Sequence, residues 1–111
     1  MLYICTADDL AELVAHCNTL VISCYSDWCP ASSQSKPVFE MISATYANRA
    51  DFAKVRTDVS PEVAGILMVK AIPTFYAVRS GQILSIMPGA ASEARLIDWM
   101  TRAFGWLDHP A

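Results

Sequence analysis

Residues 20–32 read LVISCYSDWCPAS, an apolar run that leads straight into the start of a helix. The run from Leu20 to Tyr25 is apolar almost throughout, which is typical of a central strand covered on both faces. Cys29 follows where this strand gives way to the helix. A thiol at a helix N-terminus faces unpaired backbone N–H groups and the positive end of the helix dipole, and both stabilise the thiolate that attacks disulfides. The stretch therefore predicts that Cys29 is a reactive nucleophile.

Position 32 limits what this nucleophile can do. A redox pair of the C-x-x-C kind needs its second sulfur at this position, and the sequence has serine instead. Ser32 cannot form a disulfide, so the usual resolving partner is missing. Two interpretations of Ser32 stay open: a hydroxyl without function in the first helical turn, or a hydrogen-bond donor to the Cys29 thiolate.

The composition is that of a well-buried globular protein. The 111 residues are 54% hydrophobic and 17% charged, enough for one domain with a core that needs no disulfides. The net charge of −3 offers no basic surface for nucleic acid or an anionic membrane, and we expect neither as a partner. Because the sequence shows no secretory leader and no apolar stretch of membrane-spanning length, we expect a soluble cytoplasmic protein.

The other three cysteines, Cys5, Cys17 and Cys24, are expected to lie in the core. They are too few and too irregularly spaced for a disulfide framework, and no two have the spacing of a zinc site. We therefore expect neither a metal nor a cofactor. None of the three is expected to resolve Cys29, because a disulfide needs Cα atoms within about 7 Å.

The order of predicted elements is βαβαβαββα, which implies an α/β fold with a mixed central sheet and helices on both faces. We predict residues 1–111 to form a single domain, with 105–111 as a loose C-terminal tail in which Trp106 is the residue able to pack down. The predicted elements are strand 2–5, a helix capped by Thr6, strand 20–25, helix 29–48 kinked at Pro37, strand 51–57, a short helix opened by Ser60 and Pro61, a hairpin over 75–87, and a helix capped by Ser92.

Several short motifs occur in this order of elements and in one register. Together they resemble the thioredoxin family over nearly the whole chain, from about Leu2 to Phe104. Each motif alone is a weak signal, and their combination is what favours a thioredoxin-like fold. The motifs are Trp28-Cys29 after the buried strand, Pro37 in the helix, Lys54 in the third strand, Ile72-Pro73-Thr74 before the hairpin, and Gly89-Ala90 after it.

The resemblance implies a site and its partners. It implies that Pro73 is cis and lies against Cys29, so that the backbone of Ile72 can pair with an extended substrate. The implied partners are protein disulfide substrates and an external thiol or a thioredoxin-reductase-like reductant. The implied catalytic positions are Cys29 and Ser32, the latter in place of the resolving cysteine, and the implied substrate-binding residues are Trp28, Pro30, Ala31, Ile72, Pro73, Gly89 and Ala90.

The sequence departs from the family pattern at two positions that belong together. Ser32 replaces the second cysteine, and Ser23 replaces the buried acid that is thought to deprotonate that cysteine. A base without a thiol to activate has no role, so the joint loss makes chemical sense. Without its acidic partner, Lys54 is expected to extend toward solvent.

Three hypotheses for the function follow. The first is a thioredoxin-type thiol–disulfide oxidoreductase that works with one cysteine and an external thiol such as glutathione. The second is a dithiol enzyme in which residue 32 was changed to serine to hold substrates as mixed disulfides, and Ser23 counts against it. The third is a redox-silent thioredoxin-like adaptor that uses the same groove for binding only, which the retained Trp28-Cys29 and Pro73 disfavour.

Overall fold

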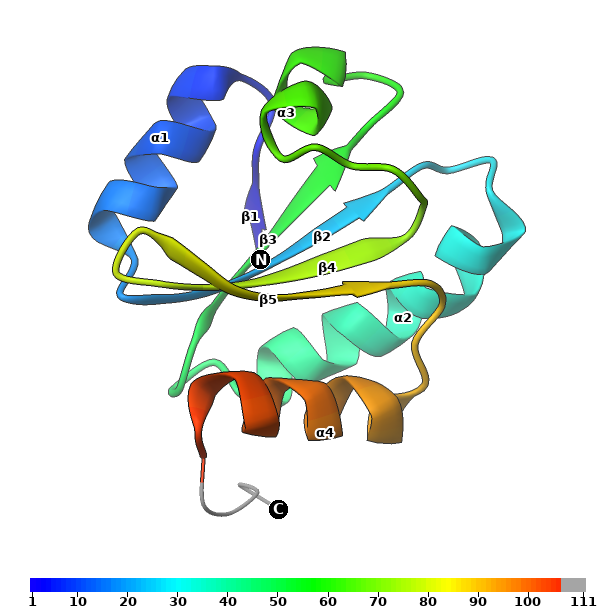
Figure 1. The fold of residues 1–111 in the computed structure, drawn as a ribbon. Helices are drawn as coiled ribbons and strands as arrows, with labels where there is room; N and C mark the ends of the chain where they lie inside the picture. Colours follow the sequence, from blue (N-terminus) through cyan, green and yellow to red (C-terminus); the bar gives the residue numbers. More distant parts are fainter. Residues whose placement is uncertain (107–111) are drawn as a thin grey trace.

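The computed structural model describes residues 1–106 as five strands and four helices in the predicted order (Figure 1). Their bounds are β1 (Leu2–Tyr3), α1 (Ala7–His16), β2 (Thr19–Tyr25), α2 (Pro30–Thr45), β3 (Asp51–Arg56), α3 (Pro61–Ile66), β4 (Thr74–Arg79), β5 (Gln82–Pro88) and α4 (Glu93–Phe104).

The strands form one mixed sheet in the order β1-β3-β2-β4-β5. β1, β3 and β2 run parallel, whereas β4 is antiparallel to β2 and β5 is antiparallel to β4. β2 is the central strand, and Leu20 to Tyr25 are all buried, as its apolar run predicts. The carboxyl ends of the parallel strands meet at one edge of the sheet, and there the chain passes from β2 into α2.

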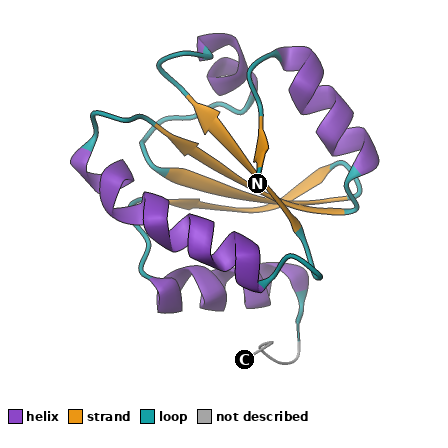
Figure 2. Ribbon diagram, turned by 180° about the vertical axis from the view of Figure 1, so that it is seen from behind, coloured by secondary structure: helices purple, strands orange, loops and turns teal. Residues whose placement is uncertain are grey.

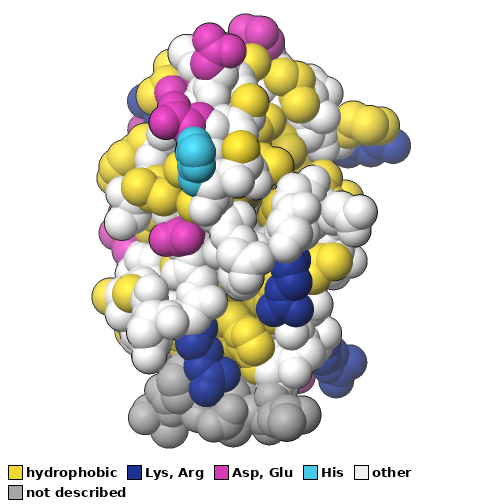
Figure 3. Space-filling model, turned by 90° about the vertical axis from the view of Figure 1, so that its left-hand side faces the viewer, with side chains coloured by type: hydrophobic (Ala, Val, Ile, Leu, Met, Phe, Trp, Pro, Cys, Tyr) yellow, Lys and Arg dark blue, Asp and Glu magenta, His cyan; other side chains and the backbone are white. Residues whose placement is uncertain are grey.

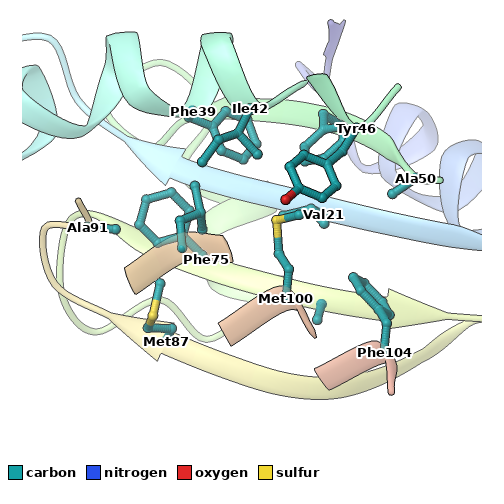
Figure 4. Packing of buried hydrophobic residues seen from close by; sticks show 13 residues of the cluster. Val21, Phe39, Ile42, Tyr46, Ala50, Phe75, Met87, Ala91, Met100 and Phe104 are labelled. Carbon is teal, nitrogen blue, oxygen red and sulfur yellow. The ribbon is translucent and has the colours of Figure 1, made fainter. Parts of the chain in front are cut away.

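Helices cover both faces of the sheet. α1 and α3 lie on one face, and α2 and α4 lie together on the other (Figure 1, Figure 2). The core under α2 and α4 holds Phe39, Phe75 and Met100, which point toward one another across the layers (Figure 4). A second core, around Val63 and Tyr76, fills the space under α1 and α3. These two layers hold the β2–α2 junction in place.

The helix ends confirm one prediction and correct another. α1 begins at a capping box between Thr6 and Asp9, as expected for a threonine cap with early acids. The second helix does not run over 29–48: Cys29 is its N-cap, Pro37 lies inside it, and it ends at Thr45. It ends early because Tyr46 is buried in the core and the chain then turns tightly toward β3.

The end of the described chain is packed. Gly105 ends α4, and the Trp106 ring stacks on Tyr46 with the ring centroids 5.7 Å apart. The predicted loose tail therefore does not begin at residue 105, because Trp106 contacts the core cluster. The rest of that predicted tail, 107–111, lies outside the described residues.

On the face that Figure 3 shows, acidic side chains of the described residues gather mostly in the upper part and basic ones mostly in the lower part, with apolar side chains among both. Within residues 1–106, no helix is both long and apolar enough to cross a bilayer. The same part of the chain contains no group of three His, Cys, Asp or Glu side chains that could hold a metal ion.

Candidate active site

Cys29 lies at the N-terminal end of α2, next to the segment that precedes β4. Its thiol donates a hydrogen bond to the carbonyl oxygen of Ile72, with 3.7 Å between sulfur and oxygen. The bond between Ile72 and Pro73 is cis, the geometry that the resemblance implies, and Pro73 is buried. The fold thus brings Cys29 to the Ile72–Pro73 segment, although 43 residues separate it from Ile72 in the chain.

The pKa of Cys29 is lowered below the ordinary value for a thiol. The main cause is the hydrogen bond from the backbone N–H of Ser32, and partial burial opposes it. Further hydrogen bonds from the Ser32 hydroxyl and the Ala31 N–H lower the pKa as well. All three donors belong to the first turn of α2, where backbone N–H groups have no partner within the helix. The predicted effect of the helix N-terminus on this thiol is therefore present.

Ser32 is buried and hydrogen bonded. Its Oγ accepts a hydrogen bond from the backbone N–H of Ser26 at 3.4 Å. That bond uses a lone pair of the hydroxyl, so its proton stays free for the Cys29 sulfur. Of the two interpretations left open by the sequence, this geometry favours the hydrogen-bond donor.

The loop that holds Gly89 and Ala90 is fixed beside Pro73. The N–H of Gly89 donates to the Pro73 carbonyl oxygen at 2.8 Å, and the φ angle of Gly89 is +95°, which a side chain would oppose. The Arg95 guanidinium donates to the carbonyl oxygens of Ala90 and Pro88. The two segments that the sequence pairs as a groove are thus adjacent.

Ser35 is a residue of this site that the sequence analysis missed. It is buried on α2, donates to the carbonyl oxygen of Ala31, and accepts from the N–H of Ala91 at 3.0 Å. It therefore ties the first turn of α2 to the Gly89–Ala90 loop. Its position one helical turn after Ala31 indicates the bond to the Ala31 carbonyl oxygen. The bond to Ala91 could not be predicted in this way, because 56 residues separate Ala91 from Ser35.

Trp28 stands at the rim of the site with 78% of its surface exposed. Its indole Nε1 donates to the Asp58 carboxylate at 3.2 Å. Arg56 pairs with Asp58 at 2.8 Å and with Asp27 at 3.4 Å, and the hydrogen bond from Arg56 is the main cause that lowers the pKa of Asp58. This network orients the Trp28 ring. Arg56 and Asp58 reach Asp27 and Trp28 because β3 pairs with β2. The sequence does not specify the register of that pairing, so the two partners could not be predicted.

Pro30 and Ala31 follow Cys29 directly and differ in how exposed they are. Pro30 is the first residue of α2 and is exposed, and Ala31 is half-buried. Proline suits this position because its missing N–H would have no helical partner. Both residues therefore form the part of α2 that is nearest in sequence to the Cys29 sulfur.

Comparison with known proteins agrees with this geometry. A thioredoxin family model matches residues 2–102. The chain belongs to the thioredoxin family. The solved structure of Fasciola hepatica thioredoxin is 28% identical, with a TM-score of 0.85 over 93% of this chain and 99% of that one. The predicted thioredoxin-like fold is thus confirmed, and family membership supports a general thiol–disulfide oxidoreductase activity.

Two further proteins are similar to this chain. An Entamoeba histolytica thioredoxin, solved as a cysteine-to-serine mutant, is 29% identical with a TM-score of 0.81, covering 92% of this chain and 97% of that one. Thioredoxin-like protein 1 from Schizosaccharomyces pombe is 36% identical over 68% of this chain, and the match spans only 26% of that protein.

The remaining cysteines differ from the prediction at one position. Cys24 is buried, and burial raises its pKa to about 12. Cys17 is buried too, and burial is the main cause that raises its pKa. Cys5 is exposed, so the prediction that it lies in the core is wrong. The reason is that β1 ends at Tyr3 and lies at the sheet edge, so Cys5 falls just beyond it.

Lys54 also differs from the prediction, because it does not extend toward solvent. Its side chain is 3% exposed, and its ammonium forms an ion pair and a hydrogen bond with the Glu40 carboxylate. That hydrogen bond is the main cause that lowers the pKa of Glu40. The family's acid at Ser23 is absent, and α2 supplies a carboxylate in its place. The sequence analysis missed Glu40, because nothing local to β3 indicates which residue of α2 lies above it.

Proposed function

We propose that this protein is a thioredoxin-type thiol–disulfide oxidoreductase that uses Cys29 as its single redox cysteine. The observation that carries the proposal is the Cys29 thiol, with its lowered pKa, against the carbonyl oxygen of Ile72. The Cys29 thiolate attacks one sulfur of a substrate disulfide. A new S–S bond forms to Cys29, the substrate S–S bond breaks, and the second substrate sulfur leaves as a thiolate.

Release of the substrate requires a thiol from outside the chain. Ser32 stands where a resolving cysteine would attack, and Cys24 is buried with a raised pKa. An external thiolate instead attacks the Cys29 sulfur of the mixed disulfide, which releases the substrate as its second thiolate and leaves the external thiol bonded to Cys29. A second external thiolate then breaks that bond, so that the Cys29 thiolate is regenerated and the two external thiols leave as a disulfide. Glutathione or a thioredoxin-reductase-like protein would supply these electrons, and the reducing cytoplasm is the compartment that suits this chemistry.

The proposed substrate-binding surface surrounds the Cys29 sulfur. An extended substrate segment would pair with the backbone of Ile72, beside the buried ring of Pro73. The residues proposed to line this groove are Trp28, Pro30, Ala31, Ile72, Pro73, Gly89 and Ala90. Trp28 contributes an exposed aromatic face, and the Gly89–Ala90 loop is held in place by Arg95 and Ser35.

A redox-silent adaptor is the second candidate. The observation that favours it is the presence of serine at both Ser23 and Ser32, which removes the acid and the second thiol of the family pattern. An adaptor of this kind would bind extended segments in the same groove without exchanging disulfides. The two candidates differ in one measurable event, the formation of a covalent adduct at Cys29.

The test is the mass of the protein after mixing with an aromatic disulfide at neutral pH. The chain should carry Cys5→Ser, because Cys5 is exposed and would add a second adduct. We expect one adduct that maps to Cys29, persists without thiol, and disappears on adding millimolar glutathione. A Cys29→Ser variant is the control and should stay unmodified. No adduct, together with retained binding of peptides to the groove, would favour the adaptor.

A further inference from the structure

A second groove begins where the candidate substrate-binding segments end. Its volume is about 380 Å³. Thr74, which follows Pro73 directly, and Pro88, which precedes Gly89, both line it. The groove therefore directly adjoins, along the chain, the two loops beside Cys29. Most of its lining is apolar and includes Ile66, Leu67, Met68, Ile83, Ile86 and Pro88, whereas Lys70 and Thr74 are its polar members.

The groove exists because β5 is an edge strand that α1 and α3 leave uncovered (Figure 1). In the sheet Ile86 pairs with Tyr76 and Pro88 pairs with Thr74. Tyr76 and Thr74 are buried, whereas Ile86 is 52% exposed. Apolar surface of β5 thus continues outward from the core toward the cis-proline segment, with open space above it.

Met68 stands at the rim of this groove in an unfavourable backbone conformation. Its φ angle is +55°, in the left-handed region, and it follows Leu67, the C-cap of α3. Glycine is the usual residue at this position, because a Cβ is disfavoured there. Met68 nevertheless carries a long apolar side chain that is 71% exposed. An unfavourable backbone conformation kept at an exposed apolar residue is typical of residues with a functional role.

We propose that this groove holds an apolar side chain of the substrate segment and that Met68 sets the preference for it. The inference rests on the proposed function, since the mixed disulfide at Cys29 is what fixes the substrate chain beside Ile72 and Pro73. An extended chain advances about 3.3 Å per residue, so residues near the substrate cysteine reach the neighbouring groove. A flexible, polarizable thioether contacts apolar groups of varied shape.

The test compares symmetrical disulfides of short peptides that differ only at one position near the cysteine, with leucine or serine at each position in turn. The measured quantity is the second-order rate of adduct formation at Cys29 in the Cys5→Ser chain. At one or more positions we expect the leucine peptide to react about tenfold faster, the discrimination that one apolar contact typically provides. Equal rates at every position would overturn the inference.

Three variants separate the side chain of Met68 from its backbone. Met68→Gln keeps the length and the strained backbone but is polar, and it should abolish most of the preference for leucine. Met68→Leu should retain the preference. Met68→Gly should lose it while the melting temperature stays equal or rises, because the left-handed conformation suits glycine. An unchanged preference in Met68→Gln and Met68→Gly would overturn the assignment.

The matched control is Ser80, which has a similar left-handed backbone with a φ angle of +50° in the β4–β5 turn. Ser80→Gly should leave the leucine preference unchanged. If the native chain forms a dimer that Met68→Gln dissociates, a second copy occupies the groove and the inference is wrong. Failure of the aromatic disulfide to modify Cys29 would instead count against the proposed function, so the two failures are distinguishable.

Discussion

Three donors in the first turn of α2 lower the pKa of Cys29, and the largest contribution comes from the backbone N–H of Ser32 rather than from a side chain. A backbone donor is present whatever residue follows the cysteine, so the low pKa survives the loss of the resolving cysteine. The Ser32 hydroxyl adds to this effect. Replacing a thiol by serine therefore removes the second redox sulfur and keeps a donor at the same place.

Ser32→Ala should raise the pKa of Cys29 but leave it below the ordinary value. The variant loses the hydroxyl donor and keeps the larger contribution of the backbone N–H. At neutral pH a smaller fraction of the thiol is then ionised, so alkylation should slow by roughly a few-fold. The measurement is the alkylation rate of Cys29 against pH. A midpoint in Ser32→Ala that is equal to or below that of the native chain would contradict the proposed hydrogen bond.

The four cysteines should react with an alkylating agent in a fixed order. Near neutral pH, Cys29 should react fastest and the exposed Cys5 next. Cys17 and Cys24 should be protected in the folded protein, because both are buried and burial raises their pKa values. Mass mapping of each site after timed labelling measures this. Labelling of Cys24 as fast as Cys29 in the folded protein would show that the site assignment is wrong.

The contact between α2 and β3 is made in part by an ion pair. Lys54 is buried under α2, with its ammonium 5.6 Å from the centre of the Tyr25 ring, and Glu40 supplies the only carboxylate recorded against it in the described chain. A buried ammonium without a counter-charge is strongly unfavourable. Glu40 thus does for Lys54 what the family's strand acid would otherwise do, from a different element.

Glu40→Gln should destabilise the fold by about 1–2 kcal/mol, because it leaves the Lys54 ammonium buried without its partner. The effect is smaller than for a fully buried pair, since the Glu40 side chain is 50% exposed. Lys54→Met should be neutral or stabilising, because an apolar side chain of similar length needs no partner. Urea unfolding at pH 7 measures both. Equal losses in the two variants would contradict this account.

The Glu40–Lys54 ion pair determines how acid changes the stability of the fold. The pKa of Glu40 is lowered from its ordinary value of 4.5, so its ionised form is favoured by folding. Its contribution is fully present above pH 4.5 and is lost as the pH falls through the lowered pKa. Glu40→Gln should therefore lose less stability than the native chain on acidification. If the stability of the native chain and that of Glu40→Gln fall in parallel with pH, the pKa of Glu40 does not change on folding.

Across the whole molecule, the site is assembled from three distant parts: the β2–α2 junction, the segment before β4 and the β5–α4 loop. Cys29, Pro73 and Gly89 are held together by the sheet and by backbone hydrogen bonds between loops. The redox cycle then depends on what else the fold places within reach of Cys29. Ser32 is within reach but cannot act as a thiol.

Ser32→Cys should restore release of the substrate without an external thiol. Intramolecular attack by a well-placed group reaches effective molarities of about 10⁵ M in favourable cases, far above millimolar glutathione. The adduct should therefore decay by orders of magnitude faster than in the native chain. The measurement is adduct lifetime by mass, in the Cys5→Ser background. A native adduct that decays as fast as that of Ser32→Cys would mean that another cysteine resolves it.

Ser23→Asp added to Ser32→Cys should accelerate release further. Ser23 is buried and pairs with Lys54 across β2 and β3, so the new carboxylate would enter beside a buried cation and under α2. There it can act as the base for the second thiol. Ser23→Asp alone is the control and should leave the native adduct lifetime unchanged. If the adduct lifetime is the same in Ser32→Cys and in the double variant, the carboxylate does not act as a base in this mechanism.

Local sequence patterns were sufficient for the type and order of the elements and for the position of the nucleophile. The apolar run before Cys29 predicts a buried strand because a strand covered on both faces cannot tolerate alternating polar residues. The cap residues Thr6 and Ser92 mark helix starts, because each accepts a hydrogen bond from an otherwise unpaired N–H. Element order and in-register motifs then predict the fold, since few arrangements satisfy both.

The tertiary structure decided everything that depends on contacts between distant segments. Lys54 is buried because Glu40 of α2 lies against it, and Trp28 is oriented because Asp58 follows a neighbouring strand. Cys5 is exposed because the edge strand is short, and Met68 adopts a left-handed backbone conformation directly after the C-cap of α3. A residue's own neighbours in sequence set its local conformation, but burial and charge pairing are set by residues that the chain brings near only on folding.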